Sequence, residues 1–133
     1  MKRGVLDTSV LVGKDRLDEV EGAISAISIA ELHFGVLVAT DSGERARRVQ
    51  RLAVIEATFD PLPLDAAVSR EWGRLAAAVR QRGGSPRKRA MDLAIAATAN
   101  VHRASLITQN TKDFKIIDDL VDLIEPSAAG LWA

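Results

Sequence analysis

The chain has 133 residues, of which 47% are hydrophobic and 27% charged, and its formal net charge is zero. This apolar content excludes a disordered chain, and the length suits one domain with a buried core. No apolar run approaches the roughly 20 residues of a membrane-spanning helix, so we expect no membrane location and no signal peptide. The lack of cysteine excludes disulfides and thiolate metal sites, which fits a cytoplasmic protein.

The charges are unevenly distributed along the chain. Residues 44–103 contain 12 basic and 6 acidic residues, whereas both flanking segments carry more acidic than basic residues. A neutral total therefore conceals a basic region of the kind that a polyanion binds. A solvated helix surface explains the same charges equally well.

Short apolar segments alternate with helical patterns along the chain. We expect strands at 5–6, 23–27, 105–108 and 123–124, and helices at 28–40, 44–59, 65–82 (with Asp65 as N-cap), 88–103 and 113–120. The Pro-containing segment 60–64 breaks the pattern and is compatible with a short strand, and 83–86 is the clearest loop. Alternating strands and helices predict an α/β fold with a parallel sheet covered on both faces.

Two carboxylates follow the first two predicted strands. Asp7 is the only charged residue between Arg3 and Lys14, and Glu31 is the only formally charged one from Gly22 to Thr40. Each has a structural alternative: Asp7 as a helix N-cap, and Glu31 as part of a capping box that begins at Ser28. The carboxyl ends of parallel strands meet in one crevice, which makes both residues candidates for a site there.

Asp92 is the strongest candidate for a functional residue. It is the only charged residue in 91–99, a helical segment that is apolar almost all round and should be central to the fold. A buried carboxylate is costly without a cation, and the alternative here is a buried salt bridge to an arginine. Asp113 follows the strand at 105–108 and looks like an ordinary loop residue, and Asn110 could serve in its place or beside it.

Taken together, the four carboxylates Asp7, Glu31, Asp92 and Asp113 indicate a metal site. Clustered carboxylates repel one another unless a cation neutralises them. The chain's only two histidines are too few for a His-rich zinc site, so the metal would be held mainly by oxygen, as Mg²⁺ and Mn²⁺ prefer. Such ions activate water and stabilise charge during phosphoryl chemistry.

At these residues the sequence resembles the PIN-domain nucleases, and among them the VapC toxins of bacterial toxin–antitoxin pairs. The resemblance rests on four segments in order, which cover nearly the whole chain: 5–9 (Val-Leu-Asp-Thr-Ser), 28–32 with Gly35, Asp92 with 95–99, and 108–110 with 113–114. It implies that residues 1–133 form one PIN-like domain. It also implies a three-layer α/β/α fold with a short central parallel sheet of four or five strands.

The resemblance further implies a site and an activity. Asp7, Glu31, Asp92 and Asp113 would bind Mg²⁺ or Mn²⁺, while Thr8, Ser9, Thr108 and Asn110 would orient ligands or waters. The protein would cleave structured RNA, tRNA or rRNA, with a metal-activated water, leaving a 5′-phosphate, and so would inhibit translation and growth. Its expected partners are a VapB-like antitoxin in a hetero-oligomer and a second copy in a homodimer.

A basic stretch at residues 80–89 leads into the helix of Asp92 and contains no acidic residue. We interpret Arg82, Arg87, Lys88 and Arg89 as RNA-binding. The alternative is a solvated flexible loop.

Two other functions are compatible with parts of the sequence. Residues 7–10 faintly resemble the nucleophile loop of haloacid-dehalogenase-type phosphatases, but Ser9 stands where that loop carries its second aspartate. A PIN-like protein that binds RNA or a partner without cutting is the other alternative, and the intact carboxylates argue against it.

Overall fold

The computed structural model describes residues 4–13 and 21–127. The elements in chain order are β1 (Gly4–Leu6), α1 (Thr8–Gly13), α2 (Ala26–Val38), α3 (Ser42–Thr58), α4 (Ala66–Gln81), the 3₁₀ helix η2 (Arg87–Arg89), α5 (Ala90–Val101), β2 (Ser105–Ile107), the 3₁₀ helix η3 (Thr111–Ile117) and β3 (Leu123–Ile124). Within these ranges, no helix is both long and apolar enough to span a membrane.

The three strands form a parallel sheet in the order β1-β2-β3. On the other edge of β1, single parallel bridges join Val5 to Ala23 and Ser25 to Leu62. The expected four or five strands are thus three regular strands and two one-residue bridges. The predicted strand at 23–27 is wrong as a regular strand, because α2 already begins at Ala26.

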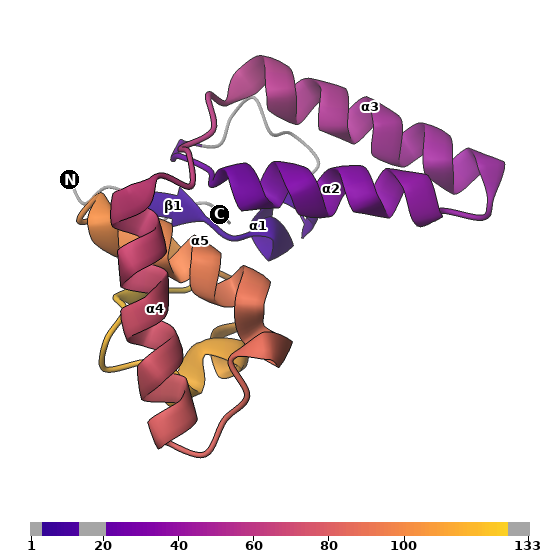
Figure 1. The fold of residues 1–133 in the computed structure, drawn as a ribbon. Helices are drawn as coiled ribbons and strands as arrows, with labels where there is room; N and C mark the ends of the chain where they lie inside the picture. Colours follow the sequence, from indigo (N-terminus) through magenta and orange to yellow (C-terminus); the bar gives the residue numbers. More distant parts are fainter. Residues whose placement is uncertain (1–3, 14–20, 128–133) are drawn as a thin grey trace.

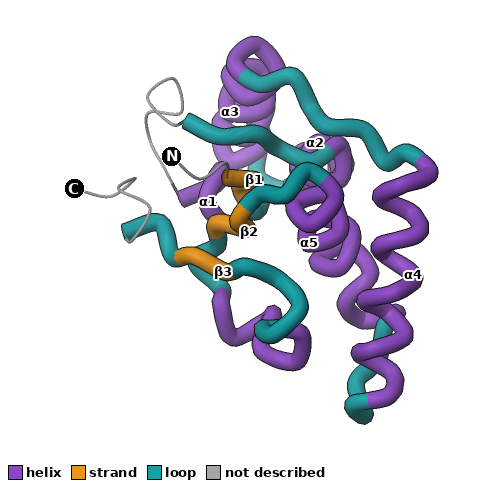
Figure 2. The backbone as a smooth tube through the Cα atoms, turned by 90° about the vertical axis from the view of Figure 1, so that its left-hand side faces the viewer, coloured by secondary structure: helices purple, strands orange, loops and turns teal. Residues whose placement is uncertain are grey.

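Helices cover both faces of this sheet, as the three-layer prediction requires (Figures 1 and 2). Alternate strand residues point to opposite faces. Val5 and Leu106 belong to one apolar cluster, with α4 and α5, and Leu6 and Ile107 belong to another, with α1 and α3. In α5, seven consecutive residues from Leu93 to Ala99 are buried, as the sequence predicts for a central helix.

The helix starts follow side-chain caps. The Asp65 carboxylate accepts the Val68 N–H at 3.0 Å, which confirms the predicted cap of α4. For α2 the cap is Ser25, whose hydroxyl accepts the Ile27 N–H at 3.1 Å. The predicted capping box is therefore wrong, because Ser28 lies inside the helix rather than at its start.

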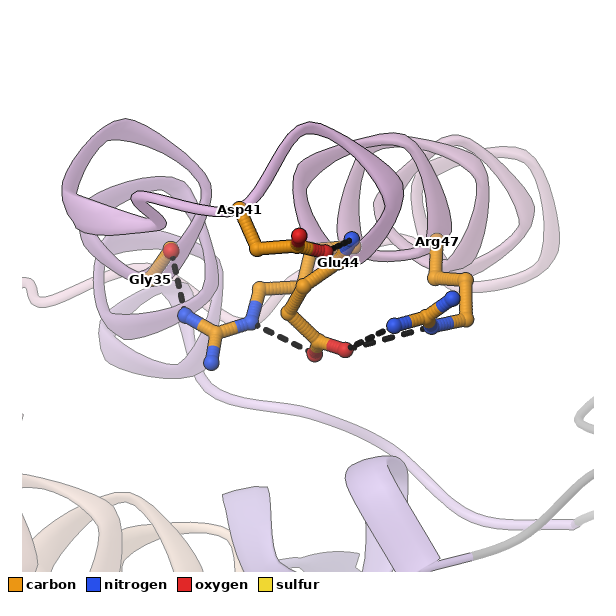
Figure 3. Close-up of polar contacts among 5 residues, drawn as sticks. Gly35, Asp41, Glu44 and Arg47 are labelled. Atoms are coloured by element: carbon orange, nitrogen blue, oxygen red, sulfur yellow. Dashed lines mark hydrogen bonds and ion pairs between the residues drawn. The ribbon is translucent and has the colours of Figure 1, made fainter.

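Arginines of α3 fix the positions of α1 and α2. The α2–α3 pair extends away from the strands in Figure 1. The Gly35 carbonyl accepts a hydrogen bond from Arg48 Nη1 at 2.6 Å, and Glu44 pairs with both Arg47 and Arg48. Figure 3 shows these contacts, with Gly35, Glu44 and Arg47 labelled. Arg51 Nη1 donates to the Leu11 carbonyl at 2.9 Å. These contacts join α3 to the two helices that carry Thr8 and Glu31.

Candidate active site

The predicted site residues gather at the carboxyl ends of the central strands. Asp7 follows β1, Thr108 follows β2, and the N–H of Asp7 donates to the Ile107 carbonyl at 2.8 Å. Around them lie Glu31 on α2, Asp92 in the first turn of α5, and Asp113 in η3. The crevice is therefore built from segments about 100 residues apart in the sequence.

Asp7 is 5% exposed and is held by hydroxyl groups. Ser9 Oγ and Thr108 Oγ1 both donate to its Oδ2 at 2.8 Å. The two hydroxyls accept in turn from the backbone N–H groups of Gln109 (3.2 Å) and Asn110 (3.0 Å). The N-cap alternative fails, since the Val10 N–H bonds to the Asp7 carbonyl oxygen and not to the carboxylate.

Glu31 faces α1 rather than its own helix start. Thr8 Oγ1 donates to Glu31 Oε1 at 2.8 Å, and Ser28 Oγ lies 2.9 Å from the same Thr8 oxygen. Burial raises the pKa of Glu31, the bond from Thr8 opposes this, and the nearby Asp7 charge adds to the rise. A carboxylate in such a place readily exchanges a proton or binds a cation.

Asp92 is half-buried, and its pKa is raised to about 6, first by burial and then by the charges of Asp7, Glu31 and Asp113, in that order. Arg89 opposes the rise through its charge, but no arginine in 4–13 or 21–127 forms an ion pair with Asp92. The buried salt-bridge alternative is therefore not supported. Asp92 therefore lies within electrostatic reach of the other three carboxylates.

Asp113 occupies an exposed position in η3, near enough for its charge to act on Asp92. Arg89 Nη1 donates to the Asp113 backbone carbonyl at 2.6 Å and so joins η3 to the start of α5. The Asn110 side chain is also exposed, and its backbone N–H is already used by Thr108. Of the two candidates for the fourth position, Asp113 is the one whose charge acts on Asp92.

The donor set fits a hard divalent cation. In the described ranges, no three acidic or imidazole side chains form a ready-made metal cage. Mg²⁺ does not need one, because it keeps several waters and binds one or two carboxylates directly. Asp92 has no hydrogen-bond partner in the described part of the chain, and Asp7 takes both hydroxyl bonds on Oδ2, which leaves Oδ1 available. Glu31 Oε2 and the Asp113 carboxylate likewise accept no hydrogen bond within the described residues, so each of the four carboxylates has an oxygen that could hold the ion.

A groove of about 840 Å³ adjoins the site between α1, α2 and α3. Thr8 of α1 and Glu31 of α2 line the groove, and Arg47, Arg48 and Arg51 line it from α3. The sequence alone does not assign these arginines to the site, because only the packing of α3 against α1 and α2 brings them beside it.

The four basic residues predicted to bind RNA have different surroundings. Arg82 pairs with Asp119 through two bonds, of 2.6 and 3.1 Å, and Arg89 is bound to the Asp113 carbonyl. Arg87 and Lys88 are exposed and have no partner within the described ranges. These last two are the freest to meet a phosphate.

Sequence reasoning missed Ser28 as a site residue, because the capping-box pattern accounted for it. The spacing offers one signal that could have found it: Ser28 and Glu31 are three residues apart, and so lie on the same helical face.

A PIN domain model matches residues 4–120. Ribonuclease VapC5 of Mycobacterium tuberculosis is 39% identical, over 86% of this chain and 87% of its own length. Ribonuclease VapC4 of the same organism is 32% identical, over 90% of this chain and 95% of its own length.

Solved structures have the same fold. One is VapBC-5 from Mycobacterium tuberculosis, with a TM-score of 0.77 and 31% identity over 94% of this chain and 98% of the other. Another is VapBC2 from Rickettsia felis, bound to a DNA fragment from its promoter, with a TM-score of 0.71 and 26% identity over 92% and 97%. With a family model that spans most of the sequence and such relatives, this chain belongs to the PIN-domain family.

Proposed function

We propose that the protein is a Mg²⁺- or Mn²⁺-dependent endoribonuclease and the toxin of a toxin–antitoxin pair. The relatives named ribonuclease VapC support the reaction class. The single observation that supports the metal dependence is the position of Asp92. It is half-buried, the charges of Asp7, Glu31 and Asp113 all raise its pKa, and it forms no ion pair in the described part of the chain. Such repulsion is costly unless a metal ion relieves it.

The carboxylates and the hydroxyls of the site have different roles in the proposed reaction. Asp7, Glu31, Asp92 and Asp113 would together hold the metal ion. A bound Mg²⁺ or Mn²⁺ supplies Lewis-acid chemistry toward water and the phosphoryl oxygens. Ser9 and Thr108 keep the Asp7 carboxylate in one orientation. Glu31 is suited to accept a proton from the attacking water at Oε2, because its raised pKa brings it nearer to neutrality.

The substrate and partners follow from the charges and the relatives. Arg87 and Lys88 in η2, directly before α5, would contact RNA phosphates. Hydrolysis would leave a 5′-phosphate on structured RNA such as tRNA or rRNA. The similar solved structures are VapBC assemblies, so we expect an antitoxin of the VapB type and a homodimeric toxin within the complex. Residues 1–133 would act as one domain, in the cytoplasm, and would slow growth when released.

The direct test is cleavage of structured RNA with Mn²⁺ and with EDTA. The variant is Asp92→Asn, and Asp60→Asn, an exposed carboxylate outside the crevice, is the matched control. We expect Asp92→Asn to lose about a hundredfold or more in rate, as when one electrostatic stabiliser is removed from an active site. Cleavage by Asp92→Asn within about tenfold of wild type would contradict the assignment. RNA binding without metal-dependent cleavage would indicate a silent PIN-like binder.

A further inference from the structure

Ser28 is a buried hydroxyl that the proposed reaction does not yet use. It lies inside α2, one turn before Glu31, and is 0% exposed. Within the described ranges its Oγ has one side-chain partner, Thr8 Oγ1, at 2.9 Å. A fully buried hydroxyl is costly without a hydrogen bond, so this contact holds Ser28 and Thr8 together.

The hydrogens determine the direction of this contact. Thr8 has one hydroxyl hydrogen and donates it to Glu31 Oε1 at 2.8 Å. The bond between Ser28 and Thr8 must then be donated by Ser28, because a hydroxyl has one donor and two acceptor positions. The result is a directed pair of hydrogen bonds, from Ser28 to Thr8 and from Thr8 to Glu31, that ends on a carboxylate of the crevice.

We propose that Ser28 is a positioning residue, which aims Glu31 at the metal site through Thr8. With both bonds in place, Oε1 is occupied and Oε2 is the oxygen that remains for the metal site. Without the Ser28 donor, the Thr8 hydroxyl can rotate away, and Glu31 loses its fixed orientation. This inference rests on the proposed metal-dependent function and adds a residue to it.

Other side chains that support a metal ligand typically change metal affinity by about 10- to 100-fold when they are removed. Ser28 lies one hydrogen bond further from the carboxylate than Thr8 does, so Ser28→Ala should weaken Mn²⁺ binding by roughly three- to tenfold. The matched control is Thr98→Val. Thr98 is equally buried, and its hydroxyl donates to the Ala94 carbonyl at 2.8 Å and lies 3.4 Å from Ser25 Oγ, but it contacts neither Thr8 nor Glu31. The control should bind Mn²⁺ as the wild type does.

The experiment is a calorimetric Mn²⁺ titration without RNA, on the wild type, Ser28→Ala, Thr98→Val, Thr8→Val and the double variant Thr8→Val/Ser28→Ala. If Ser28 acts through Thr8, its removal has no further effect once Thr8 is valine. Ser28→Cys, a weaker donor of similar size, should fall between the wild type and Ser28→Ala. On RNA at subsaturating Mn²⁺, kcat should fall in Ser28→Ala while KM stays within about twofold.

A wild type that binds no Mn²⁺ overturns both proposals. A wild type that binds Mn²⁺, together with a Ser28→Ala protein of equal affinity, overturns the positioning role alone. A Ser28→Ala loss that persists unchanged in the Thr8→Val background also overturns it, since Ser28 would then act by another route.

Discussion

Replacing Asp92 by asparagine should stabilise the metal-free protein at neutral pH, although it removes a site residue. The pKa of Asp92 is about 6 in the folded protein against 3.8 for the free side chain, because of burial and of the charges of Asp7, Glu31 and Asp113. The folded state thus disfavours the ionised carboxylate. Asparagine is similar in shape and carries no charge, so the variant avoids this cost.

The size of the effect follows from the pKa difference. About two pKa units, at 1.36 kcal/mol each, set an upper limit near 3 kcal/mol. Solvent and salt screen a half-buried group, so we expect roughly 1–2 kcal/mol. For a chain of this length, that raises the melting temperature by roughly 4–8 °C.

The gain should depend on pH in one direction. Between pH 3.8 and about 6 the folded protein binds more protons than the unfolded chain, so wild-type stability falls as pH rises through this window. The gain in the free energy of unfolding from Asp92→Asn is therefore largest above about pH 6 and disappears toward about pH 4.

The assay is a series of thermal melts in EDTA from about pH 4 to 8, with Asp60→Asn as the control. Millimolar Mn²⁺ should then raise the wild-type melting temperature and leave Asp92→Asn nearly unchanged, because a ligand of the native state stabilises it by mass action. An Asp92→Asn protein that is less stable than wild type at pH 8, or a gain that does not vary with pH, would refute the repulsion argument.

Two further predictions test the surface and the fold. The double variant Arg87→Ala/Lys88→Ala should lower the log–log salt slope of RNA binding by about 1.4 units if each residue contacts a phosphate on single-stranded RNA. The control Arg82→Ala should change the slope much less, because the Arg82 guanidinium already pairs with Asp119. Equal changes in the two variants would contradict the assignment. Asp65→Ala should lower the free energy of unfolding by about 1 kcal/mol through loss of the α4 cap, measured by urea denaturation, with RNA cleavage intact.

The sequence predicts most of the fold, because its elements are strongly patterned. Asp65 as the α4 cap and the central, buried α5 follow from local residues alone. The start of α2, in contrast, cannot be predicted from local residues. Ser25 and Ser28 are both acceptable caps, and the choice depends on Leu62, whose N–H and carbonyl pair with Ile24 and Ala26 and keep the chain extended up to Ser25. That contact is distant in sequence, so no local pattern reveals it.

The candidate site is predictable in part for the same reason. A lone carboxylate in an apolar segment is visible in the sequence, and Asp7, Glu31 and Asp92 meet in one crevice in the structure. The bond from Arg89 to the Asp113 carbonyl is not visible, because it joins a side chain of one element to the backbone of another. Arg89 therefore looked like a free phosphate-binding group in the sequence.

The pairing of β1 with β2 has a consequence for how the protein is made. Gly4 lies opposite Ser105, so β1 cannot pair with β2 until about a hundred further residues have been synthesised. Contacts this distant in sequence form slowly, because a long loop must close first. Until Thr108 has left the ribosome, the Asp7 carboxylate also lacks one of its two hydroxyl donors. A nascent chain from which Thr108 has not yet emerged should not cut RNA, so the ribosome that makes this protein meets no assembled active site before that point.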